Sequence, residues 1–263
     1  MKQKKWPFVY VGIITALTYV PILLTVIYSF NASKISSVWE GFSLRWYAEL
    51  FADRDLREAL VNSLILAFLS CLCAAVIGTA GALGMRRQKS RLDEAVAQVS
   101  MLPVMIPEII LGMVFLSVFS LMGLPFGMLT LVIAHTAFCI PYIFSMVNTR
   151  LAGMDRALEE AALDLGASPW RVFWDVTFPA ILPGLLSGLM LAFAMSFDDV
   201  VISILVTGPR VNTLPVKIYT KLKTGVTPEI NALAAVMLGI TLLLLAGSAW
   251  VGRRGGAAAE KEA

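Results

Sequence analysis

The chain has 263 residues, of which 58% are hydrophobic and only 15% are charged, and its formal net charge is +3. Soluble globular domains average about 45–50% apolar and about 25% charged residues. The composition therefore excludes an ordinary soluble domain and indicates a membrane protein.

Six apolar blocks approach or exceed the length of about 20 residues that a helix needs to cross a bilayer. They cover, approximately, Phe8–Phe30, Ala59–Met85, Ala95–Leu121, Gly127–Val147, Ala180–Val206 and Glu229–Val251. We therefore predict an all-α integral membrane protein with six transmembrane helices. The first block is too long for the apolar core of a signal peptide and no clean cleavage site follows it, so we expect an uncleaved anchor.

Basic residues between the blocks predict the orientation in the membrane. More than half of the 21 Lys and Arg residues fall in the N-terminal tail, the run "RRQKSR" at 86–91, the loop from Arg150 and the C-terminal tail. We therefore expect both termini to be cytoplasmic, with segments 31–58 and 207–228 on the outer side. Within the second outer segment, Leu214, Ile218 and Leu222 recur at helical spacing and predict an amphipathic helix.

The second and third blocks each carry a local signal. The stretch "GTAGALG" at 78–84 indicates close helix packing at the inner end of the second block. In the third block, Glu108 follows Pro103 and Pro107, and each proline removes a backbone donor and tends to kink a helix. A carboxylate at a kink in mid-membrane is a candidate wall of a pathway, although a structural role stays open.

The fourth block contains His135, the single histidine of the chain, together with Phe138 and Tyr142. We interpret His135 as a hydrogen-bonded helix-contact residue, because it has no Cys or carboxylate at the spacing of metal ligands. The three cysteines, Cys71, Cys73 and Cys139, lie inside the blocks and are interpreted as small buried residues.

The connection between the fourth and fifth blocks, residues 150–179, is predicted to form two short helices. Asp155 is a suitable N-cap for a helix that runs to Leu165, and Gly166 suits the position after its end. Ser168 followed by Pro169 then starts the second helix. An ordinary surface connector would have the same signals.

The residue pattern of this loop resembles the EAA loop of ATP-binding cassette (ABC) importer permeases. In both, the EAA triplet is followed by three residues, a glycine, nine residues and an apolar-x-apolar-Pro element, here "VTFP" at 176–179. Because alanine and glycine have small or no side chains, the surface of such a helix is smooth and can fit into a groove of a partner. Charged side chains can contact the rim of that groove. The residues expected to couple to an ATPase are Glu160, Ala161, Ala162, Gly166 and Arg171.

The resemblance extends over nearly the whole chain to the permease subunits of spermidine and putrescine importers, through "YSFNASK", "FSLRWYAEL", "SFDDVVIS", "VTGP", "TLP" and "GVTPEINALA". It implies a type I importer permease fold in a bacterial inner membrane. The implied partners are two ABC ATPase subunits, a second homologous permease and a periplasmic binding protein, with membrane lipid around the helices and no nucleic acid. The chain has no phosphate-binding loop motif, so we expect no cofactor on it and ATP on the partner.

The fifth block combines a stripe of small residues with two acids. Gly184, Gly188, Ala192 and Ser196 recur at every fourth position and predict a packing seam, within the subunit or against a second permease. Asp198 and Asp199 are costly inside a membrane unless they are paired, hydrated or protonated.

With Glu108, these two acids would suit the ammonium groups of a polyamine, and aromatic rings would add cation–π contact. The expected pathway residues are Asp198, Asp199, Glu108, Phe197, Phe193 and Tyr142, with Phe138 as a further aromatic. Capping of a broken helix or pairing with a neighbour remains an alternative for the acids, as does packing for the aromatic residues. Which of the two adjacent aspartates faces the pathway stays open.

These patterns lead to one functional hypothesis: a non-catalytic permease subunit of an ATP-driven importer that moves putrescine or spermidine inward. We expect an N-terminal helix and outer loop at 1–58, the permease domain at 59–251 and a cytoplasmic tail at 252–263. The same machine for an opine, an amino acid derivative or a metal chelate remains an alternative. A stand-alone secondary transporter or an intramembrane enzyme is disfavoured, because no inverted repeat and no nucleophile–base pair can be recognised.

Overall fold

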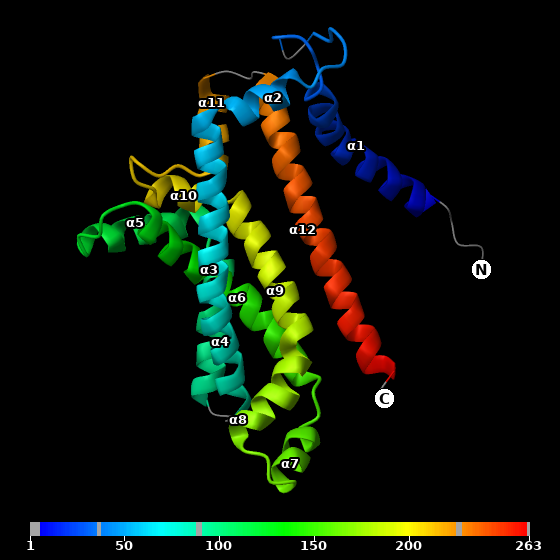
Figure 1. The fold of residues 1–263 in the computed structure, drawn as a ribbon, viewed down its shortest axis with the longest axis vertical. Coiled ribbons are helices and arrows are strands. Elements are labelled where there is room, and N and C mark those ends of the chain that lie inside the picture. The colour runs from blue at the N-terminus through cyan, green and yellow to red at the C-terminus, as the bar shows by residue number, and fades with distance from the viewer. Residues whose placement is uncertain (1–5, 36–37, 88–90, 225–227, 262–263) are drawn as a thin grey trace. The chain divides into compact units, whose positions relative to one another are not determined.

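The computed structural model describes residues 6–35, 38–87, 91–224 and 228–261. These residues are helical almost throughout, and an isolated bridge between Asn31 and Phe42 is the extent of β-pairing among them. The helices are α1 (Trp6–Tyr28), α2 (Arg45–Ala52), α3 (Arg54–Arg87), α4 (Arg91–Met105), α5 (Glu108–Leu121), α6 (Met128–Ala152), α7 (Ala157–Asp164), α8 (Pro169–Val172), the π-helical turn η1 (Phe173–Thr177), α9 (Phe178–Asp198), α10 (Val201–Val206), α11 (Leu214–Thr224) and α12 (Pro228–Lys261) (Figure 1).

Within the described residues, five helices are long and apolar enough to cross a membrane, and six if the bent pair α4 and α5 forms one span. The predicted all-α membrane architecture is confirmed. Helices suit these sequences because a bilayer offers no water to the backbone, so each N–H and C=O must be satisfied within the segment.

The third predicted span is not one kinked helix. Its two parts, α4 and α5, meet at an angle of 109° at a break over residues 106–107. Proline disfavours helical geometry in the residue before it, which places the break at Ile106. Pro103, by contrast, lies inside α4. Pro107 therefore lies at a break between two helices, and the prediction of a single kinked helix was wrong.

The fifth predicted span also ends earlier than expected. α9 stops at Asp198, Asp199 is extended (φ −68°, ψ 128°), and the last residues of the predicted block form the separate short helix α10. At the other end, α9 continues the π-helical turn η1 and starts at Phe178 instead of Ala180.

The described chain forms two compact units, Met1–Ala59 with Val216–Ile240, and Leu60–Pro215 with Thr241–Ala263. In the first unit, the buried side chain of Asn31 organises the loop after α1. It donates to the Val38 carbonyl (2.6 Å) and accepts from the Glu40 amide (3.0 Å), while the backbone carbonyl of Asn31 accepts from the Trp46 indole (2.7 Å). The predicted amphipathic helix is confirmed as α11, and two of its lysines pair within the chain: Lys217 with Asp55 and Lys221 with Glu229.

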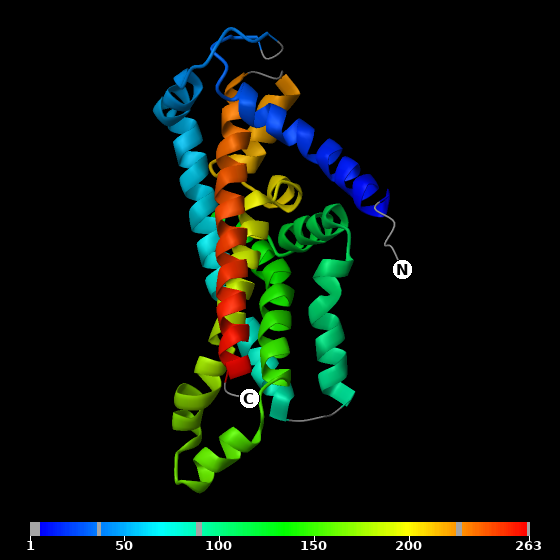
Figure 2. The same cartoon turned by 90° about the vertical axis from the view of Figure 1, so that its right-hand side faces the viewer.

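The second unit is built on the pair α6 and α9, which lie side by side in Figures 1 and 2. The predicted small-residue seam lies between them. A Cβ at Gly188 would come within 3.1 Å of the Ile143 Cα, and one at Gly184 within 2.9 Å of the Met146 carbonyl oxygen. A Cβ at either glycine would require α6 to shift, so the seam is confirmed as a contact within the subunit.

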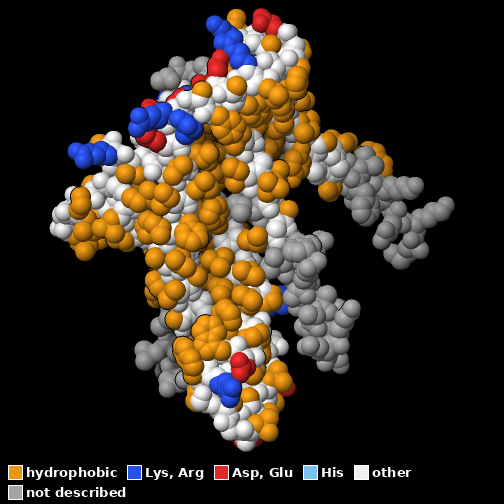
Figure 3. Space-filling view, in the orientation of Figure 1, with side chains coloured by type: hydrophobic (Ala, Val, Ile, Leu, Met, Phe, Trp, Pro, Cys, Tyr) orange, Lys and Arg blue, Asp and Glu red, His pale blue; other side chains and the backbone are white. Residues whose placement is uncertain are grey.

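In the stretch at 78–84, a Cβ at Gly78 would approach the Phe144 amide nitrogen to 3.2 Å, whereas one at Gly84 would meet nothing within 4 Å. The predicted close packing is therefore found at Gly78 and not at the inner end of the stretch. α5 and α10 pack against each other toward one end of α6 and α9. The connection between α6 and α9, residues 153–177, which contains α7 and α8 and is called the α7–α8 loop below, extends from the other end (Figure 2). In the middle of the visible face hydrophobic side chains predominate, and the charged side chains lie toward the ends (Figure 3), as expected for helices that face lipid.

Candidate functional site

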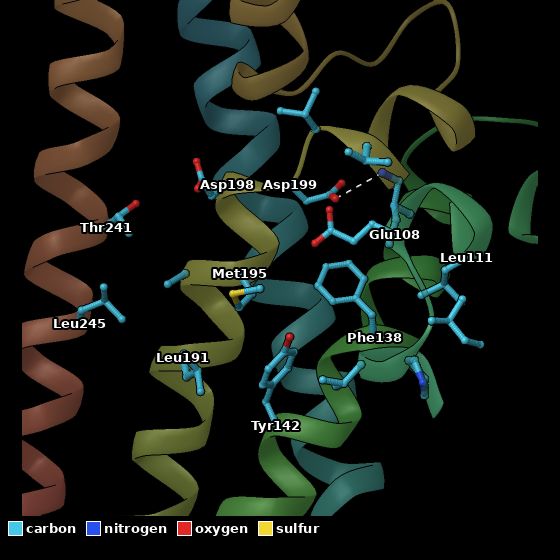
Figure 4. A pocket seen from close by; sticks show the side chains of 17 residues that line it. Glu108, Leu111, Phe138, Tyr142, Leu191, Met195, Asp198, Asp199, Thr241 and Leu245 are labelled. Atoms are coloured by element: carbon cyan, nitrogen blue, oxygen red, sulfur yellow. Dashed lines mark hydrogen bonds between the residues drawn. The ribbon is translucent and has the colours of Figure 1, made fainter. Parts of the chain in front are cut away.

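The second unit contains a cavity of about 380 Å³ lined by segments that are far apart in the sequence. The lining comes from the α4–α5 break, α6, α9, α10 and α12 (Figure 4). Three carboxylates and two aromatic side chains line it: Glu108, Asp198, Asp199, Phe138 and Tyr142. The structure therefore brings together most of the residues that the sequence singled out as a pathway.

Asp199 is held by the protein itself. Its side chain is 5% exposed, and its two carboxylate oxygens accept from the backbone amides of Ile202 (3.3 Å) and Ser203 (2.7 Å). A carboxylate that binds the first amides of a helix satisfies donors that have no partner within it. Asp199 thus caps the start of α10, and the bond to Ile202 is the dashed line in Figure 4.

His135 completes this network from α6. Its Nδ1 is hydrogen-bonded to the Ser196 hydroxyl (2.8 Å), its Nε2 to the Ser203 hydroxyl (3.0 Å), and Nε2 lies 3.5 Å from an Asp199 carboxylate oxygen. The ring is fully buried. The interpretation of His135 as a hydrogen-bonded helix-contact residue is confirmed. The sequence did not reveal its carboxylate neighbour, because Asp199 is 64 positions away in the chain.

Asp198 differs from its neighbour. It is exposed, and within the described part of the chain it makes no hydrogen bond or ion pair. Figure 4 shows its side chain turned to the α12 side, where Thr241 lies, whereas Asp199 points toward Glu108. Adjacent residues at a helix end point in different directions, so only one of the pair is committed to capping.

Glu108 is the first residue of α5, directly after the break. A carboxylate in the first turn is favoured by the positive end of the helix dipole. Glu108 therefore stabilises the start of α5 in addition to lining the cavity. It is exposed, and it has no hydrogen-bonded or ion-pair partner among the residues that the structure describes.

The aromatic residues fall into two groups. Phe138 and Tyr142 line the cavity from α6, and in Figure 4 both rings lie between α6 and α9. Phe193 and Phe197 do not line it. Their rings stack on each other at 6.2 Å, and Phe197 is fully buried.

The α7–α8 loop has the predicted caps at Gly166 and Ser168, whereas the N-cap position of α7 is Arg156 instead of Asp155. Asp155 accepts from the Ala157 amide (3.0 Å), although α7 itself begins one residue later than an Asp155 cap requires and ends at Asp164. Gly166 is in the left-handed region (φ +86°), and Ser168 accepts from the Arg171 amide at the start of α8. The first short helix is confirmed. The second starts at Pro169 as predicted, but it continues through η1 into α9 instead of ending within the loop.

The loop residues expected to couple to an ATPase lie mostly on the surface. Glu160, Ala161, Gly166 and Arg171 are exposed and Ala162 is half-buried. Beside them, Leu165 is 90% and Trp170 is 70% exposed. Large apolar side chains at the charged end of a membrane protein indicate a surface that a partner covers.

The described residues hold no group of three or more His, Cys, Asp or Glu side chains that could bind a metal ion. The arrangement instead provides a cavity with two uncompensated carboxylates and aromatic faces, which can bind an organic cation.

Comparison with known proteins gives a consistent result. Residues 72–254 match the family described as "Binding-protein-dependent transport system inner membrane component". The chain is 40% identical over 244 residues to the putrescine transport system permease protein PotI of Escherichia coli, with 90% of this chain and 87% of the relative covered. It is 36% identical over 242 residues to the spermidine/putrescine transport system permease protein PotC of Haemophilus influenzae, with coverages of 92% and 94%.

The fold is also found in solved structures. A chain of a bacterial ABC transporter involved in the import of the acidic polysaccharide alginate superposes with a TM-score of 0.71. The match covers 95% of this chain and 96% of that chain, at 16% sequence identity. The shared architecture at such low identity confirms the predicted type I importer permease fold.

Proposed function

Because the chain belongs to the family of binding-protein-dependent transport system inner membrane components, we propose that it is the permease subunit of an ATP-driven importer for putrescine or spermidine. The relatives that carry these substrates in their names align over most of both chains. The observation that carries the substrate class is the cavity, in which Glu108 and Asp198 lie together with two aromatic faces.

A polyamine is a flexible chain with ammonium groups separated by methylenes, so its binding site needs spaced negative charges and apolar contact between them. Glu108 and Asp198 supply charges that no side chain of the described protein neutralises. Phe138 and Tyr142 supply ring faces for cation–π contact. Uncompensated acids inside a membrane are costly, and a cationic substrate would offset that cost.

The two adjacent aspartates have separate roles in this proposal. Asp198 contacts the substrate, because its carboxylate is exposed to the cavity and unbound. Asp199 holds α10 and His135 in place, because its oxygens are already occupied. Phe193 and Phe197 support α9 from the packed side rather than the cavity side.

The remaining partners follow from the family and the loop. The complex contains two ATPase subunits, and one of them docks on the α7–α8 loop of this chain. The residues that contact it are Glu160, Ala161, Ala162, Gly166 and Arg171, of which all but the half-buried Ala162 are exposed. A periplasmic binding protein delivers the substrate and a second, homologous permease completes the pathway. The chain lies in the bacterial inner membrane with both termini in the cytoplasm, and it has no catalytic role of its own.

The test is a competition experiment with the complete importer in proteoliposomes. Uptake of radiolabelled putrescine is measured in the presence of spermidine, a neutral amino acid or an aminophosphonate at equal concentration. We expect spermidine alone to compete strongly, because only a second polycation satisfies both carboxylates. Equal competition by the neutral amino acid, or absence of putrescine uptake, would favour the same machine with another solute.

A further inference from the structure

The α7 helix has no buried side chain. Its leucines Leu158 and Leu163 are 58% and 46% exposed. Hydrophobic burial, which usually holds helices together, therefore contributes little to the position of α7 relative to the membrane helices. Another interaction must therefore hold the α7–α8 loop against the membrane helices if a movement of the loop is to be transmitted to them.

A polar cluster provides that interaction. The Arg86 guanidinium, 11% exposed at the end of α3, lies with its Nη1 3.0 Å from the Glu159 carboxylate of α7, which is 27% exposed. The hydroxyl of the buried Thr177 donates to the same carboxylate oxygen at 2.6 Å. Arg86 also donates to the Met154 carbonyl (3.4 Å), and Arg156 donates to the Arg86 carbonyl (2.6 Å).

The cluster joins segments that have different tasks. Arg86 belongs to α3, Glu159 to the loop, and Thr177 is the last residue of η1, immediately before α9. From there α9 runs without interruption to Asp198 in the cavity. A π-helical turn such as η1 is a rare, locally widened element that is frequently found at functional sites.

We propose that Arg86, Glu159 and Thr177 form a brace that transmits movement of the α7–α8 loop to α3 and α9. Directional, partly buried hydrogen bonds to a charge are suited to this task, because they resist displacement more strongly than exposed ion pairs do. Arg86, Glu159 and Thr177 are positioning residues that contact neither substrate nor ATP. The proposal rests on the proposed function, since it takes the loop as the ATPase docking site.

The neighbouring side chains of Glu159 and Glu160 in α7 have different roles. Glu159 is bound within the subunit, whereas Glu160 is exposed and has no hydrogen bond or ion pair in the described part of the chain. Glu160 is therefore free for an ATPase, and Glu159 is not. Loss of Glu159 should leave ATPase docking intact and lower the amount of substrate transported per ATP hydrolysed.

The experiment uses the complete importer in proteoliposomes and measures three quantities for each variant: ATPase retained on purification, ATP hydrolysis stimulated by the loaded binding protein, and putrescine taken up per ATP hydrolysed. The variants are Glu159→Ala, Thr177→Val and the exchanged pair Arg86→Glu with Glu159→Arg. Asp164→Ala, an exposed acid on the same helix, is the matched control.

For Glu159→Ala we expect full ATPase retention with uptake per ATP lowered about fivefold or more, in the range of known coupling effects. Thr177→Val should lower the ratio by a smaller factor, the exchanged pair should recover much of it, and Asp164→Ala should match the wild type. Loss of the ATPase from Glu159→Ala would overturn the brace, because Glu159 would then belong to the docking surface.

An unchanged ratio in both Glu159→Ala and Thr177→Val would also overturn the brace. If the exchanged pair does not assemble, the two single variants decide. A wild-type complex that retains no ATPase, or whose hydrolysis polyamine-loaded binding protein does not stimulate, would contradict the proposed function instead of the brace.

Discussion

At the scale of single residues, the adjacent aspartates show how one chemical group takes two roles. The Asp199 carboxylate accepts hydrogen bonds from two backbone amides and lies beside the buried ring of His135, so its charge is compensated by donors that the fold supplies. Asp198 lacks such donors within the described residues. A buried carboxylate with its donors in place stabilises a fold, whereas an exposed carboxylate without them is available to a ligand.

We predict that Asp199→Asn lowers stability and that Asp198→Asn does not. The amide places an N–H₂ group where Asp199 now accepts, so a donor would face the Ile202 or Ser203 amide and at least one buried hydrogen bond would be lost. The cost should be about 1–3 kcal/mol. Thermal unfolding of the purified complex measures it, with Asp198→Asn as the matched control. Equal melting temperatures for the two variants would contradict the assignment.

At the scale of helices, glycines decide how closely α6 and α9 approach. A Cβ at Gly184 would meet the Met146 carbonyl oxygen at 2.9 Å and the Arg150 side chain at 2.5 Å, while one at Gly239 would meet nothing within 4 Å. Close helix contacts of this kind are common in membrane proteins, where packing and not water drives association.

We therefore expect Gly184→Ala to destabilise the subunit by about 1–3 kcal/mol, the usual cost of overpacking. Gly239→Ala should be neutral or slightly stabilising, because alanine favours the helix by about 0.5–1 kcal/mol. Thermal unfolding in detergent compares the two. A Gly184→Ala protein as stable as the wild type would show that the α6–α9 seam is not close-packed.

The loop glycines give a second matched pair. Gly166 has a positive φ of 86° at the end of α7, whereas Gly153 is helical, with a φ of −86°. We expect Gly166→Asp to strain the turn and place a charge on the docking surface, so that ATPase retention and transport fall together. Gly153→Asp in the same loop should retain the ATPase. Normal transport by Gly166→Asp at normal expression would contradict the docking role.

Many of the helices, their caps and the packing seam could be predicted from the sequence, because the residue patterns that indicate them are local. The six apolar blocks, the caps at Gly166 and Ser168 and the small-residue seam each depend on residues within a few turns of one another. The sharp break at Pro107 was visible only as a tendency to kink, since the angle depends on how α5 packs against α10.

The contacts of His135 with Asp199 and of Arg86 with Glu159 could not be predicted, because each joins residues more than 60 positions apart. The sequence could identify Asp198, Asp199 and Glu108 as acids inside the predicted membrane blocks. It could not tell which aspartate caps a helix, because that depends on where α9 ends.

At the scale of the whole molecule, the orientation in the membrane remains a prediction that follows from the distribution of basic residues. A single cysteine introduced at position 160 in a background without native cysteines should be protected from an impermeant thiol reagent in intact cells and labelled after permeabilisation. A single cysteine at position 42, in the predicted outer loop, is the opposite control. Labelling of position 160 in intact cells would reverse the topology.

The central claim is that the acids of the cavity bind a polyamine during passage. The most direct measurement is putrescine uptake per assembled importer for the double variant Asp198→Asn with Glu108→Gln, compared with Glu58→Gln, an exposed acid outside the cavity. Each lost charge-assisted contact is worth about 1.5–3 kcal/mol, so uptake should fall at least about tenfold in the double variant. ATPase retention should stay at the wild-type value, and stability should fall by no more than the lost interaction of Glu108 with the α5 helix dipole, about 0.3–1 kcal/mol. Unchanged uptake per assembled complex would contradict the account.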